Sequence, residues 1–142
     1  MTVRTAVAAA VALAALAAAP MAANAAGASP ADVVNRHMAN TAKGDIDAMM
    51  ADYADDAVVL TAGKATPGKA AIRGMFEGML GPKATSKAVI KATKVWEEGD
   101  VGFVTWEMNA GTPQAATGGD EFLVRNGKIE VQAVFFGGAP AK

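Results

Sequence analysis

The dipeptide Asn126-Gly127 is the feature that most restricts the fold of this sequence. Asn-Gly between two stretches of alternating residues is the strongest short signal for a β-hairpin with a two-residue turn. The flanking stretches here are residues 119–125 and 128–136. Because strand side chains alternate between two faces, the simplest register puts one charged residue, Asp120, on the core face. The remaining residues of that face are Phe122, Val124, Ile129, Val131, Ala133 and Phe135.

Preceding segments predict three helices and further strands. Apolar residues at spacings of three and four are typical of helices, and they occur over residues 30–43, 46–53 and 69–80. Ser29 is placed to cap the first helix and Gly44 to end it. Strand patterns cover residues 57–62, 85–98 and 101–109, and residues 63–68 form a loop. This order predicts an α+β fold, with three helices on one face of a curved antiparallel sheet of four to six strands.

The first 25 residues have the pattern of a secretory signal peptide. Arg4 precedes an unbroken apolar run of fourteen residues, and Ala23-Asn24-Ala25 forms a small-x-small cleavage site. The run is shorter than the about 20 apolar residues of a membrane span. We therefore predict cleavage after Ala25, or else after Ala28, and a periplasmic or secreted protein without a membrane anchor. Residues 26–138 would then form one domain, and residues 139–142 a loose tail.

Composition excludes several classes of function. The 142 residues contain no cysteine and one histidine, and the formal net charge is −1. Disulfides, thiolate nucleophiles and cysteine metal sites are impossible, and nothing indicates binding of nucleic acid. Asp52, Asp55 and Asp56 cluster near a turn without the spacing of a calcium loop, so we interpret them as solvated. We predict neither a metal site nor a cofactor.

Two polar residues on predicted core faces are the candidate catalytic groups. His37 lies four residues from Val33 and from Thr41, on the apolar stripe of the first helix. It is either bonded to a backbone carbonyl at the edge of the core or directed into a pocket. Asp120 is either wet at the end of its strand or buried, in which case desolvation would raise its pKa. Two such groups together favour a pocket.

Five blocks of the sequence resemble the nuclear transport factor 2-like superfamily, and within it the SnoaL-like and ketosteroid-isomerase-like proteins. They are residues 33–37, 44–47, 53–59, 68–73 and 127–136. The resemblance implies a cone, in which a bent sheet and three helices enclose a cavity. It also implies a homodimer formed through the outer face of the sheet, where Trp96 and Phe103 are predicted to lie.

The resemblance also assigns roles to three positions. The isomerases of this superfamily use a tyrosine and a neutral aspartic acid as an oxyanion hole, and a second aspartate as the base. These positions correspond to His37, Asp120 and Thr61. Threonine does not remove a carbon-bound proton at neutral pH, which argues against the isomerase reaction.

Three functions stay open at this stage. The first is binding of a small, mainly apolar molecule; the second is acid–base catalysis by His37 and Asp120 on a carbonyl-containing substrate; the third is a dimeric interaction module with a filled cavity. The predicted lining of a cavity consists of His37, Thr61, Phe76, Trp106, Asp120, Phe122 and Phe135.

Overall fold

The computed structural model describes residues 27–85 and 87–137. Its helices are α1 (Pro30–Lys43), α2 (Ile46–Ala51) and α3 (Lys69–Leu80). Its strands are β1 (Tyr53–Thr61), β2 (Lys64–Pro67), β3 (Ile90–Glu98), β4 (Val101–Met108), β5 (Ala116–Arg125) and β6 (Lys128–Phe136). The predicted signal peptide and tail lie outside the described residues. None of the described helices is long and apolar enough to cross a membrane.

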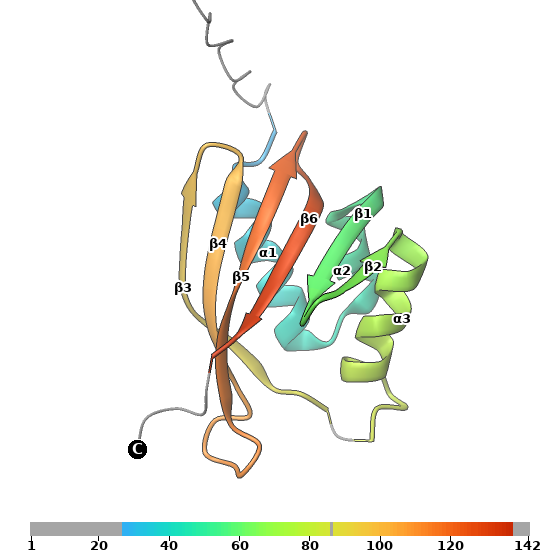
Figure 1. The fold of residues 1–142 in the computed structure, drawn as a ribbon, viewed down its shortest axis with the longest axis vertical. Coiled ribbons are helices and arrows are strands. Elements are labelled where there is room, and N and C mark those ends of the chain that lie inside the picture. Colours follow the sequence, from blue (N-terminus) through green and yellow to red (C-terminus); the bar gives the residue numbers. More distant parts are fainter. Residues whose placement is uncertain (1–26, 86, 138–142) are drawn as a thin grey trace, which may run out of the picture.

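The strands form one curved, open sheet in the order β2-β1-β6-β5-β4-β3, and the helices cover one of its faces (Figure 1). Helix α1 packs on β3, β4 and β5, while α3 packs on β1 and β2 at the other end. The predicted α+β class, with three helices on a curved sheet, is confirmed. One detail differs, because β1 pairs with β6 in parallel and the sheet is therefore mixed.

Local signals place both ends of α1 correctly. Ser29 accepts a hydrogen bond from the backbone of Asp32, whose side chain accepts one from the backbone of Ser29 in return. This capping box starts α1, and Gly44 ends it in the left-handed conformation, with φ of 69°. The buried stripe of α1 includes His37, so the helix directs this side chain towards the sheet.

The second helix is shorter than predicted. It ends at Ala51, and Tyr53 begins strand β1 instead of completing the helix. Tyr53 lies opposite Ile129 of β6 and is fully buried, so pairing with the sheet overrides the helical spacing. Residues 64–67, predicted as loop, form the edge strand β2.

A β-bulge in the last hairpin reverses part of the predicted register. Val124 lies opposite Ile129, but Leu123 lies opposite Val131, so Glu130 has no opposite residue. The extra residue moves all later side chains of β6 to the other face. Gln132 is consequently buried, with 3% exposure, whereas Phe135 is 56% exposed. The predicted inward direction of Val131, Ala133 and Phe135 is therefore wrong.

Candidate functional site

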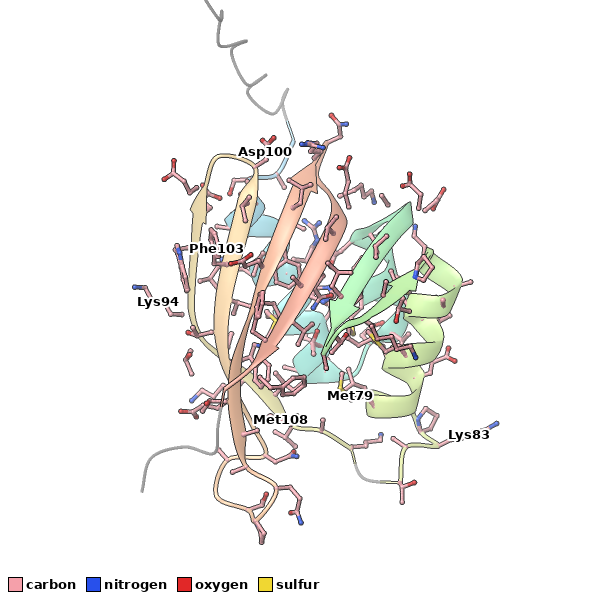
Figure 2. All side chains as sticks on the ribbon, in the orientation of Figure 1. Met79, Lys83, Lys94, Asp100, Phe103 and Met108 are labelled. Atoms are coloured by element: carbon pink, nitrogen blue, oxygen red, sulfur yellow. The ribbon has the colours of Figure 1, made fainter. Side chains whose placement is uncertain are left out.

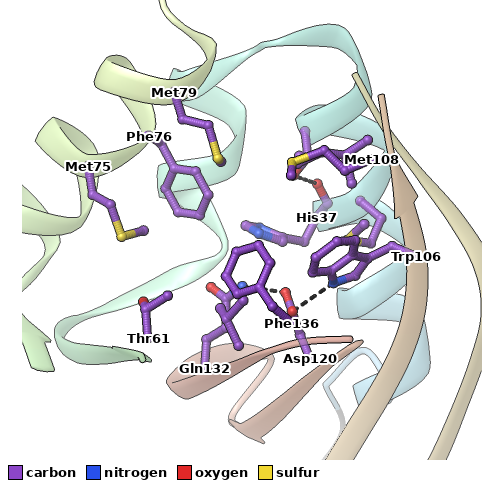
Figure 3. Close-up of a pocket in the computed structure, with 14 residues that line it drawn as sticks. His37, Thr61, Met75, Phe76, Met79, Trp106, Met108, Asp120, Gln132 and Phe136 are labelled. Carbon is purple, nitrogen blue, oxygen red and sulfur yellow. Dashed lines mark hydrogen bonds between the residues drawn. The ribbon is translucent and has the colours of Figure 1, made fainter. Parts of the chain in front are cut away.

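A cavity of about 180 Å³ lies between the helices and the inner face of the sheet (Figure 3). Its wall is almost entirely apolar and unusually rich in methionine and aromatic side chains. Helices α1 and α3, the end of β1 and strands β3 to β6 contribute to it. The lining residues are His37, Met38, Thr41, Thr61, Met75, Phe76, Met79, Ile90, Trp106, Met108, Asp120, Gln132, Val134 and Phe136.

Asp120 is the acidic group of the cavity. It is 8% exposed, and both of its carboxyl oxygens accept hydrogen bonds (Figure 3). The indole Nε1 of Trp106 donates to Oδ1 at 2.8 Å, and the amide Nε2 of Gln132 donates to Oδ2 at 2.7 Å. Burial raises the pKa of Asp120 above its usual range, against the opposing effect of these two donors and of His37. The structure thus buries Asp120 instead of leaving it wet.

Gly118 permits the position of Trp106 above strand β5. Trp106, Gly118 and Phe136 stand opposite one another on three neighbouring strands. A Cβ atom on Gly118 would lie 2.3 Å from the indole ring and 2.4 Å from the carbonyl oxygen of Phe135. Without that atom, the rings of Trp106 and Phe136 meet edge to face over the glycine, 5.4 Å apart. The indole N–H can then reach Asp120.

His37 is enclosed by aromatic rings. It is 1% exposed, and the rings of Tyr53, Phe76 and Phe122 lie 5.3–6.0 Å from its own. Its ring nitrogens face side chains and not a backbone carbonyl: Nε2 lies 3.5 Å from the hydroxyl of Tyr53, and Nδ1 lies 3.7 Å from Oδ2 of Asp52. Of the two histidine interpretations, the one with a backbone partner is wrong.

Asp52 is buried, and its interpretation as part of a solvated turn is wrong. Its side chain is 2% exposed, and its Oδ1 accepts a hydrogen bond from Nε of Arg36 at 2.6 Å. Burial acts to raise the pKa of Asp52, but the interactions with His37 and Arg36 outweigh it, so the pKa is lowered. Asp55 is solvated as predicted, with 97% side-chain exposure.

Tyr53 and Gln132 connect the two candidate catalytic residues. The hydroxyl of Tyr53 donates to Oε1 of Gln132, whose amide nitrogen donates to Asp120. Both residues are buried, and burial raises the pKa of Tyr53 well above its usual value, reinforced by the charges of Asp120 and Asp52. Sequence reasoning missed both residues. Tyr53 was assigned to a helix, and Gln132 was placed on the outer face because no local pattern reveals the bulge.

The predicted lining residues fall into three groups. His37, Thr61, Phe76, Trp106 and Asp120 all line the cavity. Phe122 does not line it but packs against the ring of His37. Phe135 points away from the cavity, and Phe136 takes the inward position instead.

Two lining residues have a buried polar atom without a hydrogen-bond partner among the described residues: the hydroxyl oxygen of Thr61 and Nδ1 of His37. Within residues 27–85 and 87–137, no group of three or more histidine, aspartate or glutamate side chains is arranged to hold a metal ion.

A curved open sheet, three helices on its inner face and a polar cluster at the floor of a cavity define a protein of the nuclear transport factor 2-like fold. The SnoaL-like domain family matches residues 34–132. The chain therefore belongs to the SnoaL-like domain family.

Solved structures of low sequence identity share this fold. A protein of unknown function from Burkholderia xenovorans LB400, described as NTF-2 like, is 20% identical, with a TM-score of 0.65 over 78% of this chain and 83% of its own. A candidate polyketide cyclase from Sinorhizobium meliloti is 24% identical, with a TM-score of 0.64 over 72% and 93%. A candidate ketosteroid isomerase from Kribbella flavida is 12% identical, with a TM-score of 0.67 over 78% of each chain.

No curated protein matches the sequence. Because the solved structures are at most 24% identical to this chain, their similarity establishes the fold alone.

Proposed function

We propose that this protein binds a small, mainly apolar molecule of about one ring in its cavity. The observation that carries the proposal is the cavity of about 180 Å³, whose wall is almost entirely apolar and includes one acidic side chain, that of Asp120. An apolar cavity of about 150 Å³ in another protein stays dry and binds benzene. The wall of this cavity matches that kind of ligand in both size and chemistry.

The polar groups of the cavity would orient the ligand. Asp120 and the hydroxyl of Thr61 lie on the lining, and the Thr61 oxygen has no partner among the described residues. A buried hydroxyl without a partner costs free energy, so a ligand with one polar atom near Thr61 would recover that cost. We therefore favour a ring with a single carbonyl or hydroxyl group. The methionines of α3, Met75 and Met79, would adapt to its outline.

Two adjacent residues of β6 provide a matched test. Val134 lines the cavity, while Phe135 points away from it. Val134→Trp should fill the cavity and abolish binding of one-ring ketones and phenols in calorimetric titrations. Phe135→Trp should bind them as the unchanged protein does. Equal binding by both variants would place the ligand elsewhere and refute the proposal, as would the absence of binding by the unchanged protein to any one-ring compound.

Acid–base catalysis is the second candidate, favoured by the burial of Asp120 within the cavity. Its raised pKa makes a proton available for transfer nearer neutral pH than for an ordinary aspartic acid. Thr61 still provides no base for the isomerase reaction. Turnover of a cyclic ketone that is lost in Asp120→Asn, with binding retained, would establish this candidate. Binding without turnover would exclude acid–base catalysis of the compounds tested and would support ligand binding as the function.

The outer face of the sheet supports the predicted homodimer. Trp96 and Phe103 stack there with 5.3 Å between ring centroids, and Nζ of Lys94 lies over the Trp96 ring. Lys94 and Phe103 are labelled in Figure 2. Leu60 and Phe135 are also exposed, by 42% and 56%. We propose that a second copy covers this face, in which case Trp96→Lys should convert a dimer to a monomer in sedimentation experiments. The open cavity weighs against a purely structural module.

Export remains part of the proposal. The N-terminal sequence of protein recovered from the periplasm or medium should begin at Ala26, or at Ser29 if the second cleavage site is used. Protein retained in the cytoplasm with Met1 in place would contradict export.

A further inference from the structure

The polar groups beneath the cavity form one continuous chain. Hydrogen bonds join His37 to Tyr53, Tyr53 to Gln132 and Gln132 to Asp120. Asp52 lies beside His37, with 3.7 Å between its Oδ2 and the Nδ1 of His37. Asp52 caps the end of α2, His37 lies on α1, Tyr53 begins β1, and Asp120 and Gln132 lie on β5 and β6; all five are buried. Gln132 lies between Tyr53 and Asp120, and its amide is a hydrogen-bond acceptor on one side and a donor on the other.

We infer that Gln132 couples the protonation of Asp120 to that of His37, since rotation of its amide selects which of the two residues holds a shared proton. The inference goes beyond ligand binding and does not depend on it. It makes Gln132 a positioning residue, which acts through Asp120 and His37.

The observed orientation corresponds to the proton on His37. The amide nitrogen of Gln132 donates to Asp120, so Asp120 acts as an acceptor, which is the role of an ionised carboxylate. The amide oxygen accepts from Tyr53, whose single proton is thereby used. The oxygen of Tyr53 can then only accept from Nε2 of His37, 3.5 Å away, while Nδ1 of His37 faces Asp52. In this arrangement His37 carries a proton on each nitrogen.

A half-turn of the amide gives a second complete arrangement. The carbonyl oxygen of Gln132 then faces Asp120, which carries the proton on Oδ2 and donates it. The amide nitrogen donates to the oxygen of Tyr53, and the hydroxyl of Tyr53 turns to donate to Nε2 of His37. His37 keeps one proton, on Nδ1 facing Asp52. The number of protons is unchanged, because the proton that leaves Nε2 of His37 equals the one gained by Oδ2 of Asp120.

The other combinations each leave a mismatched contact. If both His37 and Asp120 lack the proton, two acceptors face each other at Tyr53 or at Asp120. If both carry it, two donors face each other somewhere along the chain. The side chains that make these contacts are buried, and a mismatched polar contact is costly in a buried site. The protonation of the two residues is therefore anticorrelated.

The surrounding charges allow both arrangements. Asp52 and Arg36 form an ion pair next to His37, and the side chain of Asp52 is 2% exposed. The lowered pKa of Asp52 keeps it ionised, so it faces a protonated Nδ1 in either arrangement. Tyr53 has a raised pKa and keeps its proton. The side-chain hydrogen-bond partners of Asp120 are Trp106 and Gln132, and neither of them is charged.

The test is a titration followed by NMR. His37 is the only histidine, so the ¹⁵N signals of its ring are identified without assignment, and the carboxyl ¹³C signal of Asp120 is followed in the same sample. Strongly coupled groups titrate in macroscopic steps that belong to the pair. We expect both signals to show the same two steps in the unchanged protein.

Two variants interrupt the chain at different points. Gln132→Met removes the amide at nearly constant volume, and Tyr53→Phe removes only a hydroxyl. In each variant, His37 and Asp120 should show one separate step each, so the His37 response at the Asp120 midpoint is lost. Thr61→Val, which changes a cavity oxygen outside the chain, should retain the two shared steps.

Two results would overturn the inference. The first is separate single steps in the unchanged protein. The second is shared steps that persist in a folded variant, which would assign the coupling to charge acting through space. A dispersed amide spectrum establishes folding, and if Gln132→Met does not fold, Tyr53→Phe decides alone.

Discussion

Gly118→Ala tests most directly how the sheet holds Asp120. The new Cβ atom would lie 2.3–2.4 Å from two carbon atoms of the Trp106 indole and from the carbonyl oxygen of Phe135. Ordinary contacts of this kind are about 3.5–4.0 Å, so the ring must move by more than about 1 Å. The 2.8 Å hydrogen bond from Trp106 to Asp120 cannot survive that displacement.

The magnitude follows from three contributions. Loss of a buried hydrogen bond to a carboxylate costs about 1.5–3 kcal/mol, and overpacking costs about 1–3 kcal/mol. Alanine returns about 0.5–1 kcal/mol relative to glycine within a strand. We therefore expect Gly118→Ala to lower the free energy of unfolding by about 1.5–5.5 kcal/mol. It should also raise the pKa of Asp120 further, because one of the two donors that lower it is lost.

Urea unfolding measures the stability, and tryptophan fluorescence in a Trp96→Phe background reports on Trp106 alone. The neighbouring Gly119→Ala is the matched control, because the atom nearest to its Cβ would be the carbonyl oxygen of Val104, at 3.0 Å, followed by the side chain of Thr105 at 3.9 Å. Its effect should be clearly smaller, with the Trp106 spectrum retained. If Gly118→Ala costs less than about 1 kcal/mol and leaves the spectrum unchanged, the role assigned to Gly118 is wrong.

Three further predictions concern stability. Thr61→Val should raise the free energy of unfolding by about 1 kcal/mol, since it removes a buried hydroxyl without a partner; Thr61→Ser, measured alongside in urea, should not. Asp120 has a raised pKa when folded, so its contribution to stability declines as the pH rises from its ordinary pKa of 3.8 through the folded value. Asp120→Asn should flatten that decline in unfolding midpoints measured across pH, and an unchanged slope would contradict the burial argument. Gly78→Ala on the open face of α3, where a Cβ meets nothing within 4 Å, should raise the melting temperature through a gain of about 0.5–1 kcal/mol.

Some parts of the fold are determined by interactions close along the chain. The turn at Asn126-Gly127, the capping box at Ser29 and the left-handed glycine at Gly44 each depend on residues within four positions of one another. The resulting hairpin and helix were therefore predictable. The inward positions of His37 and Asp120 were predictable for the same reason. His37 lies in a regular helix, and Asp120 lies in β5, which does not contain the extra residue of the bulge.

The remaining features depend on contacts between distant segments. Tyr53 belongs to a strand and not a helix because it pairs with β6, whose residues are more than seventy positions later. Asp52 is buried because Arg36 and His37 of α1 accompany it. No periodicity within residues 44–56 contains that information.

The sequence by itself determined the class of fold, the ends of its first helix and the two inward polar groups, because local backbone preferences and apolar spacing specify them. The tertiary structure alone decided which side chains His37 and Asp120 contact. A single unpaired residue at Glu130 exchanges the faces of Gln132 and Phe135, and it does so where Gln132 meets both Tyr53 and Asp120. The register that satisfies three buried polar groups at once is a property of the packed sheet, and no strand contains it alone.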